Sequence, residues 1–249
     1  MTFTFDPVVL TAFVLALVRA TAWIVVSPPF NTRLVPVSVK AGLAATLALA
    51  AAPHVADPNI GLDTGSFIAA LITQVLVGFA LGMVTVLLVN AVQAAGALID
   101  LFAGFSLAAI VDPMNNAEVA VFGRFYEVLA VTLLFSTNAY LVLVNGFFRS
   151  FEVIPARGLA VHDVADVLTK NIGQFFIASI EIAGPVLGCL FLTEVFLGVL
   201  SRAAPQLNVF SLAFPVRVVV ALIVVGLAVP LIGPAIGNLV RDAVAPLGG

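Results

Sequence analysis

Charged side chains are scarce in this chain of 249 residues. Only 10 are Lys or Arg and 13 are Asp or Glu, which is 9% of the sequence, whereas an average soluble domain has about 25%. Hydrophobic residues make up 62%, and the mean hydropathy is +1.22. So little charge cannot cover a water-facing surface, which excludes a soluble globular enzyme and a disordered chain. The composition predicts an integral membrane protein built of helices.

Cysteine, histidine and basic residues are also scarce. Cys189 is the single cysteine, so no internal disulfide can form, and with His54 and His162 as the only histidines the chain lacks a structural-zinc cluster. A net charge of -3 excludes a nucleic-acid binder, which needs a basic surface. The sequence contains no metalloprotease, serine-hydrolase, phosphate-loop or dinucleotide-binding motif. We therefore expect no enzymatic activity and no metal or cofactor.

Six apolar segments approach the length of about 20 residues that a helix needs to cross a bilayer. The third has no charged residue over 33 positions, and at about 1.5 Å per residue it is long enough to require tilting, bending or extension beyond the bilayer. We expect the fifth to be broken by Glu181, Pro185 and Glu194, and the sixth to lose its regularity at Pro230 and Pro234. The predicted fold is an all-α membrane protein of about six long, partly kinked helices. The segments are 8–26, 39–52, 67–99, 128–148, 172–200 and 216–239.

The basic residues show no preference for one side of a membrane. Six spans would place four of them on one side and five on the other, so the usual excess of Lys and Arg on the cytoplasmic side is absent. Of the aromatic residues, 20 are Phe, which leaves few Trp and Tyr for the headgroup interface. Both observations indicate that protein neighbours replace much of the lipid.

Charge in lipid is costly, so ionisable side chains inside or beside the apolar segments are expected to face a protein interior or a water path. Four of them, Arg124, Glu127, Glu181 and Glu194, are expected to be buried. The others are Arg19, Asp100, Asp112, Glu118, Arg202 and Arg217. Arg124 and Glu127 are three residues apart and are expected to pair on one helix face. Glu181 and Glu194 are separated by about 220° around a regular helix, so we expect them to face different neighbours. Pairing with polar groups of a partner subunit is favoured for them over a role as a proton relay.

Pairs of glycines four residues apart let two helix backbones approach closely. Three such pairs in one chain predict close helix packing somewhere in the molecule. They are Gly78 and Gly82, Gly184 and Gly188, and Gly233 and Gly237.

A polar stretch with two prolines separates the fifth and sixth apolar segments. The prolines free backbone groups, and a glutamine and an asparagine between them offer side-chain donors and acceptors. Two phenylalanines are spaced to share one helix face, and an arginine flanks each end. The stretch predicts a helical hairpin with a polar tip. Its residues are Arg202, Pro205, Gln206, Asn208, Phe210, Phe214, Pro215 and Arg217.

This stretch, R-x-x-P-Q-x-N-x-F-x-x-x-F-P-V-R, resembles the FliR family of bacterial type III export membrane proteins. Three upstream stretches resemble the same family and occur in the same order. They are the prolines and basic residues of 28–40, the G-F-S to D-P segment of 104–113, and the Ser150-Phe151 stretch that ends at Pro155. The resemblance therefore extends over nearly the whole chain.

The resemblance implies a subunit of the flagellar export gate, located in the bacterial inner membrane at the flagellar basal body. Such a subunit assembles with FliP, FliQ and FlhB, and unfolded flagellar proteins pass through the channel. The resemblance also implies a FliP-like part over about residues 1–155 and a FliQ-like helical hairpin over about residues 168–249, within one helical export-gate domain.

The family's loop before the Asp-Pro pair acts as a plug in the closed channel. Its two bulky apolar positions match Leu107 and Ile110, which are aliphatic here although aromatic side chains are common in the family. An apolar constriction stops ions by excluding water. The candidates for the plug or seal are Phe105, Leu107, Ile110, Asp112, Pro113 and Met114.

Two other functions stay open. A homologous subunit serves injectisomes and shares the P-Q-x-N-x-F core, although the F-P-V-R continuation favours the flagellar branch. A small-solute or ion transporter could use Glu181 and Glu194 as a midplane site, but the inverted repeat that such a fold predicts is not visible in the sequence.

Overall fold

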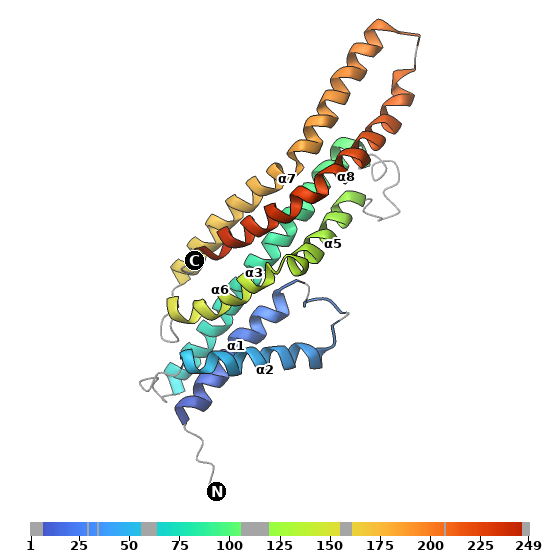
Figure 1. Cartoon of the computed structure of the whole chain (residues 1–249). Helices are drawn as coiled ribbons and strands as arrows, with labels where there is room; N and C mark the ends of the chain where they lie inside the picture. Colours follow the sequence, from blue (N-terminus) through green and yellow to red (C-terminus); the bar gives the residue numbers. More distant parts are fainter. Residues whose placement is uncertain are drawn as a thin grey trace, which may run out of the picture. The chain divides into compact units, whose positions relative to one another are not determined.

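The computed structural model describes residues 7–28, 30–33, 35–55, 64–105, 120–154, 161–206 and 208–245, with the backbone alone for 161–168, 170 and 210. Every long element in this part of the chain is an α-helix, and five are long and apolar enough to cross a membrane, or six if α5 and α6 form one broken span. The predicted all-α membrane fold is confirmed. The helices are α1 (Pro7–Val26), α2 (Val37–Val55), α3 (Thr64–Ala103), α5 (Val121–Ser136), α6 (Tyr140–Val153), α7 (Val161–Ala203) and α8 (Val209–Val244) (Figure 1).

The helices form two compact units. The first comprises Met1–Leu88, Tyr140–Gly173 and Val240–Gly249, and therefore contains α1, α2, α6 and the first part of α3. The second comprises Val89–Ala139 and Gln174–Leu239, and contains α5 with most of α7 and α8. Three long helices, α3, α7 and α8, thus contribute to both units.

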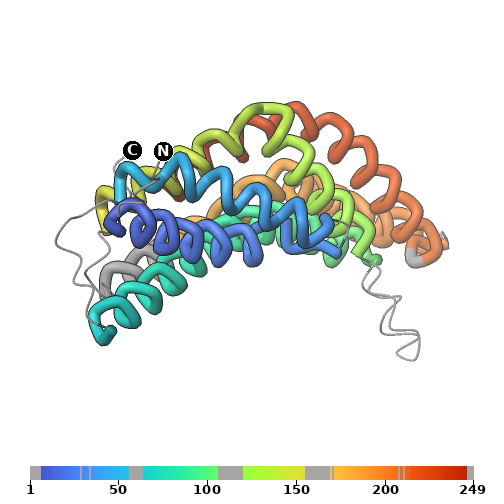
Figure 2. Tube along the Cα trace, turned by 90° about the horizontal axis from the view of Figure 1, so that it is seen from below, coloured from blue at the N-terminus to red at the C-terminus, as the bar shows by residue number. Residues whose placement is uncertain are grey.

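Small residues let the helices of the first unit pack closely. α1 and α2 lie against each other (Figure 2), and Ala12, Ala16 and Ala20 of α1 are fully buried. A Cβ atom on Gly78 would overlap the Arg19 carbonyl oxygen, and one on Gly82 would lie 2.6 Å from the Val26 Cβ. The first glycine pair is therefore a close helix contact, as predicted.

The other two glycine pairs make no such contact inside the chain. Among the described residues, no atom lies within 4 Å of a Cβ built on Gly184, Gly188 or Gly237, and the neighbours of Gly233 are at an ordinary 3.9 Å. Close packing between the described helices of the chain is thus formed by one of the three glycine pairs, which agrees with the prediction of close packing somewhere in the molecule.

The segment 128–148 is not one continuous helix but a pair of helices bent by 73°, which corrects the prediction of an ordinary span. α5 ends at Ser136 and α6 begins at Tyr140. Asn138 has a φ of 57°, a left-handed conformation that asparagine adopts more readily than most residues. The break therefore occurs without proline or glycine, at a Ser-Thr-Asn sequence that apolar content alone did not reveal.

The prolines do not interrupt the long helices, which is a second correction. Pro185 lies inside α7, and Pro215, Pro230 and Pro234 lie inside α8. Each proline removes one amide donor, and helices in membrane proteins tolerate this when neighbouring groups satisfy the freed carbonyl. α7 and α8 accordingly run for 43 and 36 residues.

Candidate functional site

Most plug candidates lie outside the described residues. These are Leu107, Ile110, Asp112, Pro113 and Met114. Phe105 is described, and it lies two residues after the end of α3 at Ala103. The structure therefore shows the helix ends that border this segment, all within the second unit.

Phe105 joins two of the motifs found in the sequence. The centroid of its ring lies 5.8 Å from the ring centroid of Phe122 and 6.0 Å from that of Phe214. Interplanar angles of 76° and 71° are the edge-to-face geometry that aromatic pairs favour. This Phe105 cluster (Phe105, Phe122 and Phe214) connects the end of α3, the start of α5 and the start of α8.

Asp100 fixes the start of α5 to the end of α3. Its side chain is buried, and its two oxygens accept hydrogen bonds from the backbone amides of Phe122, at 3.0 Å, and Gly123, at 2.8 Å. The first turn of a helix has amides without intrahelical partners and a partial positive charge, so a carboxylate is favourable there. Gly96 permits the approach, since a Cβ at that position would overlap the Phe122 carbonyl.

The hairpin between α7 and α8 has the polar tip that the sequence predicts. Pro205 and Gln206 form an exposed turn. Asn208 precedes α8, and its Oδ1 accepts a hydrogen bond from the Ser211 amide at 3.3 Å, which makes it the N-cap of that helix. Arg202 is exposed in the last turn of α7. The side chain of Phe210 is not described, so the face it shares with Phe214 stays a prediction.

Glu194 of α7 and Arg217 of α8 form an ion pair across the hairpin. Both carboxylate oxygens contact the Arg217 Nη2, at 2.6 and 2.8 Å. The predicted partner of Glu194, a group on another subunit, is therefore replaced by a residue of the same chain. Glu194 lies 11 residues before Pro205 and Arg217 lies 11 residues after Gln206, so the symmetry of the hairpin was a usable signal for this pair.

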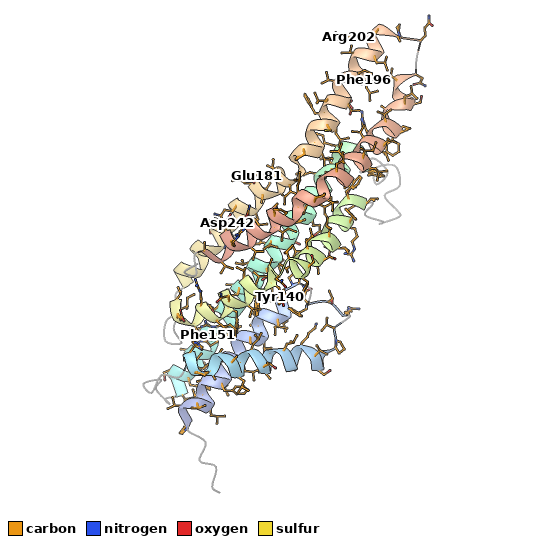
Figure 3. The ribbon with its side chains drawn as sticks, viewed as in Figure 1. Tyr140, Phe151, Glu181, Phe196, Arg202 and Asp242 are labelled. Atoms are coloured by element: carbon orange, nitrogen blue, oxygen red, sulfur yellow. The ribbon has the colours of Figure 1, made fainter. Side chains whose placement is uncertain are left out.

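The other charges expected to be buried lie mostly on the surface of the chain. Arg124 and Glu127 pair at 2.6 Å, as predicted, but their side chains are 74% and 32% exposed. Glu181 is exposed on α7 (Figure 3), and 57% of the Glu194 side chain is exposed. The described helices of this chain leave these side chains uncovered, so their burial against another subunit stays a prediction.

Arg19 faces the protein interior, as expected, but the network that holds it in the first unit was not predicted from the sequence. Arg19 of α1 is fully buried and donates three hydrogen bonds: Nε to Gln74 Oε1 at 2.6 Å, Nη1 to Ser150 Oγ at 2.9 Å, and Nη2 to the Ile154 carbonyl at 3.0 Å. Its guanidinium carbon also lies 3.9 Å from the ring centre of Phe151, near the end of α6 (Figure 3). This network ties α1, α3 and α6 together.

The network explains one of the motifs. Ser150 and Phe151, noted in the sequence only for their resemblance to a family pattern, are the hydroxyl and the aromatic ring that hold Arg19. In the part of the chain that the structure describes, no carboxylate forms an ion pair with Arg19. Neutral oxygen acceptors and a cation–π contact therefore stabilise its charge.

Comparison with known proteins gives a match along almost the full length. The family model of bacterial export proteins, family 1, matches residues 10–243. The chain is 30% identical to the flagellar biosynthetic protein FliR of Bacillus subtilis, over 92% of this chain and 90% of that protein. It is 31% identical to FliR of Escherichia coli, over 93% and 92%. It is also 29% identical to the Yop proteins translocation protein T of Yersinia pestis, over 85% and 83%.

Proposed function

Because this chain belongs to the family of bacterial export proteins, family 1, we propose that it is a subunit of the flagellar type III protein export gate in the bacterial inner membrane. The observation that carries the proposal is the match to flagellar FliR proteins over about nine-tenths of the chain. This match extends over both structural units of the chain and is not confined to a single pair of helices. We further propose that FliP, FliQ and FlhB are its partners and that unfolded flagellar proteins are its cargo.

Uncovered charge supports a role inside a larger complex. Arg124, Glu181 and Glu194 are exposed on helices that are mostly apolar, and charged side chains in a membrane normally face protein or water. The chain also exposes many large apolar side chains, among them Phe176 at 69% and Leu227 at 73%. Neighbouring subunits would cover both kinds of surface.

The proposed plug belongs to the same function. A closed gate must stop ions while still admitting an unfolded chain, and an apolar constriction can do both because water is excluded until cargo displaces the apolar side chains. Leu107, Ile110 and Met114 are the proposed seal. The Phe105 cluster and Asp100 hold the helix ends on either side of this segment.

Replacing residues 107–110 by glycine should raise the ion current through the closed complex in planar bilayers, because the large apolar side chains that exclude water are removed. Ala108→Gly with Ala109→Gly is the matched control, since it loosens the backbone but leaves Leu107 and Ile110 in place. An ion current equal to that of the unsubstituted complex would contradict the plug assignment.

A second candidate is the injectisome, supported by the similarity to the Yersinia translocation protein. Deletion of the gene separates the two functions. A flagellar subunit predicts that the cells stop swimming and that a plasmid copy of the gene restores swimming. Normal swimming together with loss of injectisome secretion would support the second candidate instead.

A further inference from the structure

An apolar groove in the second unit contains the hairpin ion pair. It has a volume of about 310 Å³ and is open to the outside. Its apolar walls are well exposed: Leu101 at 57%, Phe102 at 51% and Phe191 at 64%. The groove is lined by Leu101 and Phe102 of α3, Leu190, Phe191 and Glu194 of α7, and Arg217 of α8.

Neither lipid nor water suits this groove. The ion pair lies in helices that are long and apolar enough to cross a membrane, and hydrocarbon would contact a carboxylate side chain that is 57% exposed. Water would solvate the carboxylate but would leave two phenylalanines and a leucine uncovered. A protein helix can satisfy both surfaces, because it presents apolar side chains and polar groups together.

The charges in the groove indicate which chemical group a helix bound there needs. A carboxylate has about four acceptor positions, and Arg217 Nη2 occupies one on each oxygen of Glu194. The other positions are left on a carboxylate that lines the groove and whose side chain is 57% exposed. A neighbouring helix that covers them needs a hydrogen-bond donor, because a buried acceptor without a partner costs about 1–3 kcal/mol.

We propose that this groove binds an apolar helix from a different membrane subunit, and that a donor side chain on this helix bonds to Glu194. The proposal rests on the proposed function, since it takes the chain to be one subunit of a mixed complex. Phe102 and Phe191 would pack against the apolar face of the incoming helix. Arg217 would hold the Glu194 carboxylate in place and offset its charge.

The first test compares two phenylalanines of equal exposure. Phe191 and Phe196 both lie on α7 and are both 64% exposed, but only Phe191 lines the groove. Figure 3 places Phe196 farther along α7, towards Arg202. An affinity-tagged chain is purified from the membranes of its bacterium in mild detergent, and the other membrane subunits that co-purify are measured by quantitative mass spectrometry. Phe191→Ala should reduce at least one of them about fivefold or more, whereas Phe196→Ala should keep the unsubstituted amount.

The second test exchanges the two charges. Glu194→Arg combined with Arg217→Glu restores an ion pair within the hairpin but presents a cation where the groove now offers a carboxylate. We expect the double variant to keep the thermal unfolding midpoint of the unsubstituted chain and yet to lose the same subunit as Phe191→Ala. Each single substitution should lower both the unfolding midpoint and the co-purified amount.

Three results would overturn the proposal. Equal co-purification by Phe191→Ala and the unsubstituted chain would mean that lipid covers the groove. Full recovery of the subunit by the double exchange would mean that the ion pair acts only within the hairpin. Loss of a differently tagged second copy of this chain, and of no other subunit, would identify the occupant as the same protein. If the unsubstituted chain co-purifies with no other membrane subunit, the proposed function itself fails.

Discussion

Arg19→Met should unfold at a clearly lower temperature than the unsubstituted protein in the same detergent. Met replaces the apolar stem of Arg19 but offers no donor, so the Gln74 side-chain oxygen and the Ile154 carbonyl lose their buried donor. Each orphaned acceptor costs about 1–3 kcal/mol, so we expect a loss of roughly 3 kcal/mol. The cation–π contact with Phe151 is also lost.

Arg19→Lys should recover only part of this stability. An ammonium group is a compact donor and cannot reproduce the planar fork that serves Gln74, Ser150 and Ile154 at once. Arg33→Met is the matched control, because Arg33 is exposed and surface substitutions usually change stability by no more than about 0.5 kcal/mol. An unchanged midpoint for Arg19→Met would show that the network contributes nothing to the fold.

Asp100→Ala should release the first turn of α5. Two buried amides, of Phe122 and Gly123, would lose their acceptor, and the favourable charge at the helix start would disappear. A loss of about 2 kcal/mol in local stability corresponds to roughly 30-fold faster amide exchange at the start of α5. Hydrogen exchange followed by mass spectrometry measures this directly.

Asp100→Asn should show a smaller increase in exchange, because one carbonyl oxygen can still accept one of the two hydrogen bonds. Asp242→Ala removes an exposed carboxylate from α8 (Figure 3) and should leave exchange in α5 unchanged. If Asp100→Ala left the exchange rate of this turn as it is, the carboxylate would not be what fixes α5 to α3.

The apolar pattern predicted most helices well because lipid and protein interiors select the same side chains. The predicted span 8–26 differs from α1 by one residue, and 67–99 lies within α3. The break between α5 and α6 was missed, because Thr137, Asn138 and Ala139 interrupt the helix within a segment that is apolar on average. The prolines led to the opposite error. Interruptions were predicted at them, but a proline in a packed membrane helix does not end the helix.

Contacts between distant residues were harder to predict than helices. Arg124 and Glu127 could be paired from their spacing alone, because one turn of a helix brings them together. Arg19 and Ser150 are 131 positions apart, and the amide that donates a hydrogen bond to Asp100 belongs to a different helix. The single sequence contains no information on which helices are neighbours, so the buried polar contacts of Arg19 and Asp100 emerge only from the fold.

The central claim is that flagellar protein export depends on this chain. Its most direct test is the amount of flagellar filament and hook protein that reaches the medium from a deletion strain, compared with the amount inside the cells. The account predicts that export falls below detection while the proteins are still made, and that a plasmid copy of the gene restores export. Undiminished export from the deletion strain would contradict it.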